Sequence, residues 1–114
     1  MHELGVVFHI INEVEKVASE NNVTKVNKIT LEVGEVSTIV IDYFKECFDW
    51  AKAKSEYLKE CELNLIVLQA LSYCEDCQNS YSTTKYGKIC PNCQSKHTYL
   101  ITGDQVSIKD IEVI

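Results

Sequence analysis

The sequence predicts an α+β fold in which two helices pack on a three-stranded sheet, with a small cysteine-rich insertion before the last strand. Two stretches have apolar residues at helical spacing, three have the short apolar runs of strands, and four cysteines gather between residues 74 and 93. A chain of 114 residues is long enough for one domain with a modest core. We assign residues 1–69 and 104–114 to an α+β domain and residues 70–103 to the insertion.

The first predicted helix follows directly on the first three residues. Its apolar positions recur every three or four residues and so share one face. They are Leu4, Val7, Phe8, Ile11, Val14, Val17 and Ala18. Asn21-Asn22 is a plausible end, since asparagine tolerates the left-handed conformation that is common after a helix.

The first predicted strand and the second helix are separated by Gly34. Residues 28–33 alternate, with Ile29, Leu31 and Val33 on one side, which predicts a half-buried strand. Ser37 is predicted to cap the helix that follows. The apolar stripe of that helix is interpreted as core. It comprises Ile39, Val40, Tyr43, Phe44, Cys47, Phe48 and Ala51.

Residues 63–68 and 106–113 are the other two predicted strands. In the last strand the apolar positions shift from Val106 and Ile108 to Ile111 and Val113. Because side chains alternate with a period of two, this shift predicts a bulge or a bend near Lys109-Asp110.

Composition excludes several classes of protein. A net charge of −6 argues against general nucleic-acid binding, which needs clustered lysine and arginine. Apolar runs such as Leu65 to Leu68 are too short to cross a membrane, and the start of the chain lacks the pattern of a signal peptide. We therefore expect a cytoplasmic protein with no membrane partner, in a compartment where cysteine clusters more often bind metal than form disulfides.

The paired motifs Cys74-x2-Cys77 and Cys90-x2-Cys93 are separated by twelve residues. Two such knuckles can bring four thiolates around one tetrahedral zinc ion, which predicts a zinc-ribbon-like zinc domain. Four thiolates leave no open position, so this Zn²⁺ is expected to be structural. A redox pair would explain one motif but not two.

Other residues near the cysteines qualify this prediction. Gln78 and Gln94 stand where many zinc knuckles have glycine, and if φ is positive there each costs on the order of 1 kcal/mol. His97 is either an auxiliary metal ligand or a surface residue. Cys47 and Cys61 are more consistent with core positions than with ligands.

Met1-His2-Glu3 places an imidazole one residue from the α-amine of Met1, and Glu3 adds a carboxylate. An amine, the following amide nitrogens and an imidazole can together bind a metal ion with square-planar geometry, which suits Ni(II) or Cu(II). A chance residue, or the remnant of a tag, is the alternative interpretation of His2. Because amine and imidazole must both be neutral to bind, such a site would be labile and better suited to delivery than to catalysis.

These features together resemble the HypA/HybF family, the nickel-incorporation metallochaperones of [NiFe]-hydrogenase maturation. The resemblance covers essentially the whole chain: MHE at 1–3, LEVGEVS at 31–37, the paired CxxC motifs with CPNC at 90–93, and Gly103-Asp104 before the last strand. It implies Ni²⁺ as cargo at His2, Met1 and Glu3, zinc at Cys74, Cys77, Cys90 and Cys93, and no catalysis.

The resemblance further implies two partners, a nickel-binding GTPase of hydrogenase maturation and the hydrogenase large subunit, with the chain as a monomer or homodimer. Whether urease is also a target is left open. Some relatives carry histidines beside the zinc cysteines. Here both CxxC interiors lack them, which argues against a pH-sensitive change of zinc ligands.

Two rival functions remain from the residues alone. A zinc-ribbon nucleic-acid-binding module would use Tyr73, Tyr81, Tyr86 and Tyr99 to stack bases. Residues 71–99 carry a balance of +1, but the rest of the chain holds −7, which argues against this alternative. A zinc hydrolase would need an open metal position that four thiolates do not provide.

Overall fold

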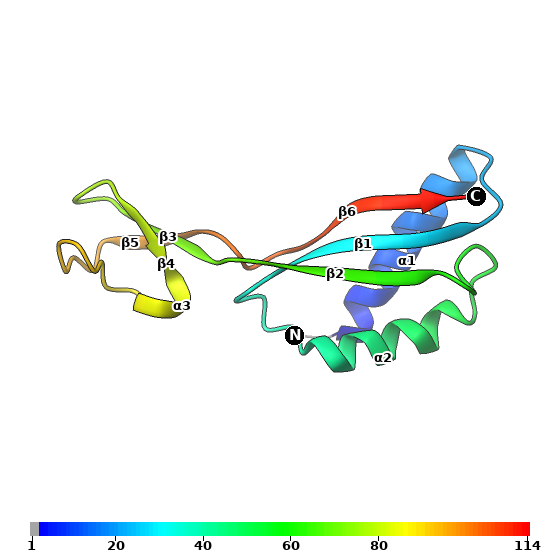
Figure 1. The fold of residues 1–114 in the computed structure, drawn as a ribbon, viewed down its shortest axis with the longest axis horizontal. Coiled ribbons are helices and arrows are strands. Elements are labelled where there is room, and N and C mark those ends of the chain that lie inside the picture. The colour runs from blue at the N-terminus through cyan, green and yellow to red at the C-terminus, as the bar shows by residue number, and fades with distance from the viewer. Residues whose placement is uncertain (1–2) are drawn as a thin grey trace. The chain divides into compact units, whose positions relative to one another are not determined.

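The computed structural model describes residues 3–114 and confirms the α+β fold class (Figure 1). The elements are α1 (Glu3–Glu20), β1 (Val26–Gly34), α2 (Ile41–Lys52), β2 (Glu62–Leu68), β3 (Leu71–Cys74), β4 (Ser80–Ser82), α3 (Thr83–Tyr86), β5 (Thr98–Thr102) and β6 (Val106–Val113). They form two three-stranded sheets, ordered β2-β1-β6 and β4-β3-β5.

The chain divides into two compact units. The helical unit contains the described residues up to Glu32, together with Ile39–Ile66 and Ser107–Ile114. The cysteine unit contains Val33–Thr38 and Val67–Val106. No helix within residues 3–114 is both long enough and apolar enough to span a membrane.

In the helical unit α1 and α2 lie against each other on one face of the sheet β2-β1-β6 (Figure 1). Helix α1 ends near the predicted place, where Asn22 has a φ of 56°. Strand β1 begins two residues earlier than predicted. Its inward residues Ile29, Leu31 and Val33 are buried, as the alternation indicates.

The predicted cap of α2 is wrong. The helix begins at Ile41, and the residue at its N-cap is Val40, whose side chain makes no capping hydrogen bond. Ser37 lies in a turn closed by its own N–H, which donates to the Gly34 carbonyl at 3.0 Å. Thr38 then adopts a φ of 67°, so the chain turns again before the helix starts. Ser37 is therefore too far upstream to cap it.

The interpretation of the α2 stripe as core is correct for Phe44, Cys47, Phe48 and Ala51, which are buried. It is wrong for Val40 and Tyr43, which are more than half exposed. Only a narrow face of α2 is needed to cover a sheet of three strands and to contact α1. The apolar residues beside that face, Val40 and Tyr43, therefore remain exposed to solvent.

The apolar shift in the last strand is visible in β6. Val106, Ile108 and Ile111 are half-buried, and the residues between them are exposed. The spacing of the partly buried residues thus changes from two to three, although β6 remains one element.

In the cysteine unit β3 pairs antiparallel with both neighbours, with Ser72 opposite Tyr81 of β4 and Leu100 of β5. The sequence alone predicted none of β3, β4, β5 or α3. The segment 33–38 belongs to this unit through three backbone hydrogen bonds of 2.8 Å. They are Gly34 N–H to Gln105, Glu35 N–H to Leu68 and Val36 N–H to Gly103.

Candidate metal centre

The four cysteines Cys74, Cys77, Cys90 and Cys93 come together in the cysteine unit. Their sulfur atoms all lie within 4.8 Å of one another. The Sγ atoms of Cys74 and Cys93 are 3.5 Å apart, as are those of Cys77 and Cys90. Around a tetrahedral zinc ion with Zn–S bonds of about 2.3 Å, neighbouring sulfurs would be about 3.8 Å apart. The donor set therefore fits one tetrahedral, thiolate-bound ion.

The two CxxC motifs have the same backbone geometry. The N–H of Gln78 donates to the Cys74 carbonyl at 2.9 Å, and the N–H of Gln94 donates to the Cys90 carbonyl at 2.8 Å. Both glutamines have positive φ, 61° and 62°, as the glycine found in many zinc knuckles suggests. Each turn thus aims both its sulfurs toward the same point, at the cost of one left-handed residue.

Asp76 connects the two knuckles. Its carboxylate accepts hydrogen bonds from the Ser95 hydroxyl and from His97 Nδ1, the latter at 3.0 Å. These contacts hold the pKa of Asp76 below its usual value, the Ser95 bond most strongly. His97 is therefore oriented by a carboxylate of the first knuckle and is not part of the four-cysteine group. Nothing in the residue spacing revealed this Asp76 contact.

The thiols of the centre differ in acidity. Hydrogen bonds from the side chains of Asn92 and Asn79 lower the pKa of Cys77 to about 6. The Ser95 backbone N–H lowers the pKa of Cys93, but desolvation and the neighbouring thiols outweigh it and raise that pKa to about 12. Of these two thiols, Cys77 therefore loses its proton at the lower pH.

Among residues 3–114 the four cysteines are the one group of this kind that could hold a metal ion. Cys47 and Cys61 are buried outside it, as the sequence indicates. Burial raises the pKa of the Cys61 thiol to about 11. Both side chains act as small apolar groups of the helical core.

Of the predicted nickel ligands, Met1 and His2 lie outside the described residues. Glu3 opens α1 and is 7% exposed. Its carboxylate accepts a hydrogen bond of 2.9 Å from the Val40 N–H at the start of α2. The residue directly after Met1-His2 is therefore tied to the rest of the helical unit.

The tyrosines proposed to stack nucleic-acid bases do not form one open surface. Tyr81 is buried, and its hydroxyl donates to the Gly87 carbonyl at 2.9 Å. Its ring packs edge-on against Tyr86, with the ring centroids 6.2 Å apart. At least one of the four rings is thus a core residue, which weakens the nucleic-acid alternative.

The fold and the site define a metal-binding protein of the α+β class with a closed four-thiolate centre. A family model described as hydrogenase/urease nickel incorporation, metallochaperone, HypA matches residues 1–113. The chain therefore belongs to the HypA family of nickel metallochaperones of hydrogenase maturation, which are not enzymes.

Individual relatives agree with this assignment. The hydrogenase maturation factor HypA of Actinobacillus succinogenes is 34% identical over 113 residues, covering 99% of both chains. That of Trichormus variabilis is 36% identical and covers 99% of this chain and 96% of its own. The solution structure of the Ni metallochaperone HypA from Helicobacter pylori superposes with a TM-score of 0.78, covering 100% of this chain and 98% of its own. At 23% identity, this last comparison concerns the fold alone.

Proposed function

We propose that this chain binds one Ni²⁺ ion at its N-terminus and delivers it for insertion into the hydrogenase large subunit. The amine of Met1, the amide nitrogen and imidazole of His2, and the amide nitrogen of Glu3 would supply the donors, an arrangement that leaves the contact between the Glu3 carboxylate and Val40 in place. Amine, amide and imidazole nitrogens in a short peptide chelate suit the square-planar preference of nickel. Nickel is cargo in this proposal, held by groups that release it readily.

The observation that carries the proposal is the attachment of Glu3. A chelate at a trailing terminus would present its metal in no fixed direction. Here α1 begins at Glu3, whose carboxylate contacts the Val40 N–H of α2. Any ion held by the two preceding residues would therefore start from a fixed point on the helical unit.

We further propose that Cys74, Cys77, Cys90 and Cys93 hold a structural Zn²⁺. When bound, the ion supplies a cross-link between two knuckles that otherwise share little apolar contact. The buried residues around the cluster are few, chiefly Cys74, Tyr81 and Cys90 themselves. A unit with so small a core depends on metal binding for its folding free energy, about 10–16 kcal/mol in zinc-finger peptides.

The partners in this proposal are a nickel-binding GTPase and the hydrogenase large subunit, and the chain acts in the cytoplasm as a monomer or homodimer. Six free cysteines with no disulfide among them fit a reducing compartment. The sequence relatives named hydrogenase maturation factor support the hydrogenase target.

Nickel titration by calorimetry tests the N-terminal site. We expect His2→Ala to abolish tight nickel binding, and one extra residue before Met1 to do the same by converting the primary amine to an amide. Affinity should fall between about pH 8 and pH 6, because the amine and imidazole, with reference pKa values of about 7.7–8.0 and 6.5, must both lose protons. Equal affinity in native, substituted and extended proteins would overturn the proposal. Unchanged zinc content in all three is the control.

A further inference from the structure

The four sulfur atoms of the metal centre form two close pairs, and each pair joins one knuckle to the other. The Sγ atoms of Cys74 and Cys93 are 3.5 Å apart, and so are those of Cys77 and Cys90. Each pair therefore takes one cysteine from the first CxxC motif and one from the second. A redox pair within one motif leaves the other motif unexplained, whereas two pairs between the motifs use all four thiols.

The two members of each pair differ in their access to solvent. Cys93 is exposed, whereas its partner Cys74 is fully buried. Cys77 is half-buried, whereas its partner Cys90 is buried. At 3.5 Å the two sulfurs of a pair are in van der Waals contact. Each pair thus has one sulfur that a small oxidant can reach from solution and a second sulfur in contact behind it.

This arrangement suits a two-step oxidation by hydrogen peroxide. The accessible thiolate attacks one peroxide oxygen, the O–O bond breaks, hydroxide leaves and the sulfur becomes a sulfenic acid. The buried thiolate then attacks that sulfur, the S–O bond breaks and a second hydroxide leaves as the disulfide forms. One peroxide takes two electrons from each pair, so two peroxides convert four thiolates into two disulfides and four hydroxide ions.

The two knuckles are held face to face by contacts that do not involve the metal. The Asp76 carboxylate in the first knuckle accepts hydrogen bonds from the Ser95 hydroxyl and from His97 Nδ1, just beyond the second knuckle. The Cys74 and Cys90 carbonyls close their own turns by accepting the N–H group that follows each motif. A disulfide bond is about 2.05 Å long, so each pair of sulfurs needs to approach by only about 1.5 Å. We therefore expect oxidation to link the knuckles, because both close pairs already lie between them.

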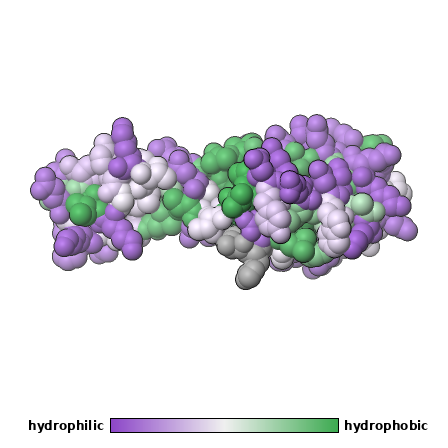
Figure 2. All heavy atoms as spheres, turned by 90° about the horizontal axis from the view of Figure 1, so that it is seen from below, coloured by the Kyte–Doolittle hydropathy of each residue, from purple (hydrophilic) through white to green (hydrophobic). Residues whose placement is uncertain are grey.

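We propose that the cysteine unit is a peroxide-sensitive switch, in which oxidation forms the disulfides Cys74–Cys93 and Cys77–Cys90 and releases the metal. This inference rests on the proposed zinc site, because a sulfur in a disulfide is no longer the thiolate that binds the ion. The core of this unit is small, and in Figure 2 its side chains, at the left, are mostly hydrophilic or neutral. Two disulfides between the knuckles would replace the ion as the cross-link, so the oxidised unit should stay folded. A dithiol reductant with Zn²⁺ should restore the original state.

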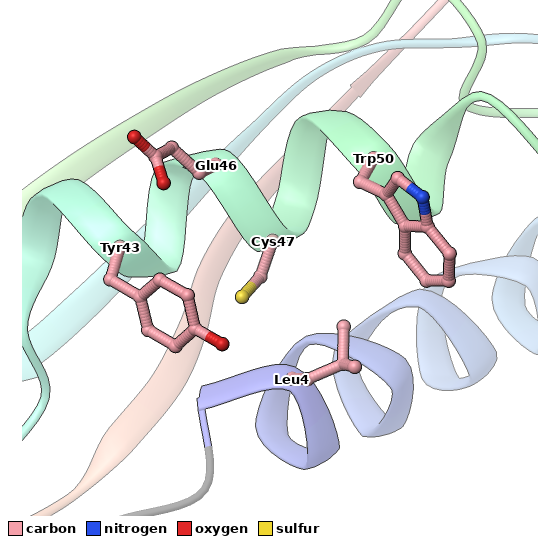
Figure 3. A pocket seen from close by; sticks show the side chains of 5 residues that line it. All are labelled: Leu4, Tyr43, Glu46, Cys47 and Trp50. Carbon is pink, nitrogen blue, oxygen red and sulfur yellow. The ribbon is translucent and has the colours of Figure 1, made fainter.

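Cys47 and Cys61 are internal controls, because both are buried in the helical unit and lie outside the four-cysteine group. Figure 3 shows the Cys47 sulfur directed from α2 toward the start of α1. The other residues that line this pocket are Leu4, Tyr43, Glu46 and Trp50. None of these four side chains carries a thiol, so they offer no partner for a disulfide. Cys47 should therefore be recovered as a free thiol after mild oxidation.

Titration of the full-length, zinc-loaded chain with hydrogen peroxide tests the proposal. A chromophoric chelator measures the zinc that is released, and free thiols are then alkylated before digestion with Lys-C and Asp-N. These enzymes cut between Cys74 and Cys77 and between both of them and the second motif, so linked peptides report the pairing. We expect two peroxide molecules to be consumed for each zinc ion released. Fragmentation of the linked peptides should assign Cys74 to Cys93 and Cys77 to Cys90.

A matched pair of variants tests which sulfur reacts with which. Cys74→Ser removes the buried partner of Cys93, so Cys93 should be recovered as a sulfenic acid trapped by dimedone, while the Cys77–Cys90 disulfide still forms. Cys47→Ser removes a buried thiol outside the cluster. It should match the native chain in zinc release and in both disulfides.

Three outcomes would overturn the switch alone. In the first, peptide mapping finds the disulfides within the motifs, Cys74 with Cys77 and Cys90 with Cys93, so that the knuckles are not joined. In the second, peroxide releases zinc but oxidises the cysteines to sulfinic acids, which a dithiol does not reduce. In the third, the zinc and all the thiols survive the titration. A purified chain that holds no zinc is a separate result, because it refutes the zinc site and this proposal together.

Discussion

The Glu3 carboxylate accepts a hydrogen bond of 2.9 Å from the backbone N–H of Val40, which joins the first residue of α1 to the N-cap of α2. Valine has no side-chain acceptor, so α2 starts without a local cap. A carboxylate near the N-terminus of a helix satisfies an open N–H group and interacts favourably with the helix dipole. Glu3, 37 residues away in the chain, performs this function for α2.

We predict that Glu3→Ala lowers the free energy of unfolding of the helical unit by about 1 kcal/mol, the usual cost of losing a cap. Glu3→Gln keeps a side-chain oxygen and should cost less than half of that. Urea unfolding followed by circular dichroism measures both. Glu13→Ala, at an exposed position of the same helix, is the control. If Glu3→Ala and Glu13→Ala were equally stable, the capping role would be wrong.

The positive φ angles of Gln78 and Gln94 predict a stabilising substitution. Replacing Gln78 by glycine removes the strain of a side chain in the left-handed region, about 1–2 kcal/mol, and adds back a smaller backbone entropy cost. We expect the metal-loaded cysteine unit to gain up to about 1 kcal/mol, seen as slower loss of metal to a chelator. Gln69→Gly, where φ is not positive, should only destabilise. The same loss in both variants would contradict the prediction.

Gly34 allows a close backbone approach. A Cβ atom on this residue would lie 2.1 Å from the Gly103 carbonyl oxygen, which also accepts the Val36 N–H. Gly34→Ala therefore forces the chain apart and should cost about 3 kcal/mol, measured as a lower urea midpoint. Gly5→Ala, in the helical context of α1, should instead stabilise by up to about 1 kcal/mol. Native stability in Gly34→Ala would show that the approach is not required.

Removing one thiolate should empty the metal centre. We predict that Cys90→Ser loses its zinc on dialysis and that its cobalt-substituted form gives an altered spectrum. The reason is that the site then has three thiolates and one hydroxyl group in place of four thiolates. The helical unit should retain most of its circular dichroism signal, while the cysteine unit becomes disordered. Cys47→Ser, a buried thiol outside the cluster, should keep one zinc ion per chain. Full occupancy and an unchanged cobalt spectrum in Cys90→Ser would refute the assignment.

The raised pKa of the Cys61 thiol predicts that the folded protein loses stability at alkaline pH. Burial raises the pKa of its thiol from 9.0 to about 11, so the unfolded chain releases this proton at lower pH than the folded chain does. The contribution of this thiol to the free energy of unfolding should therefore be constant below pH 9. Between about pH 9 and 11 it should lower the free energy of unfolding by about 2–3 kcal/mol. Cys61→Ala should lack this component. Parallel pH profiles for the two proteins would contradict it.

Much of the helical unit was predictable from its sequence because its signals are local. The apolar spacing of α1, the alternation of Ile29, Leu31 and Val33, and the left-handed Asn22 each depend on neighbouring residues. The prediction that Ser37 caps α2 was wrong, because a second turn at Thr38 lies between Ser37 and the start of the helix. Periodicity also could not show how much of the α2 stripe the sheet covers, so the exposure of Tyr43 was missed.

Some features of the candidate metal centre were likewise predictable from the sequence, and others were not. The sequence by itself determined which four cysteines gather, because CxxC spacing constrains the knuckle backbone wherever the knuckle lies. It also indicated that Gln78 and Gln94 stand at positions where glycine is common, and the structure gives both a positive φ. Only the tertiary structure decided that Asp76 joins the knuckles through Ser95 and His97, about twenty positions on. It likewise decided that Val33–Thr38 belongs to the cysteine unit and that Glu3 caps α2. These contacts join residues distant in the chain, and no periodicity encodes which distant backbone groups a carboxylate or a glycine will meet.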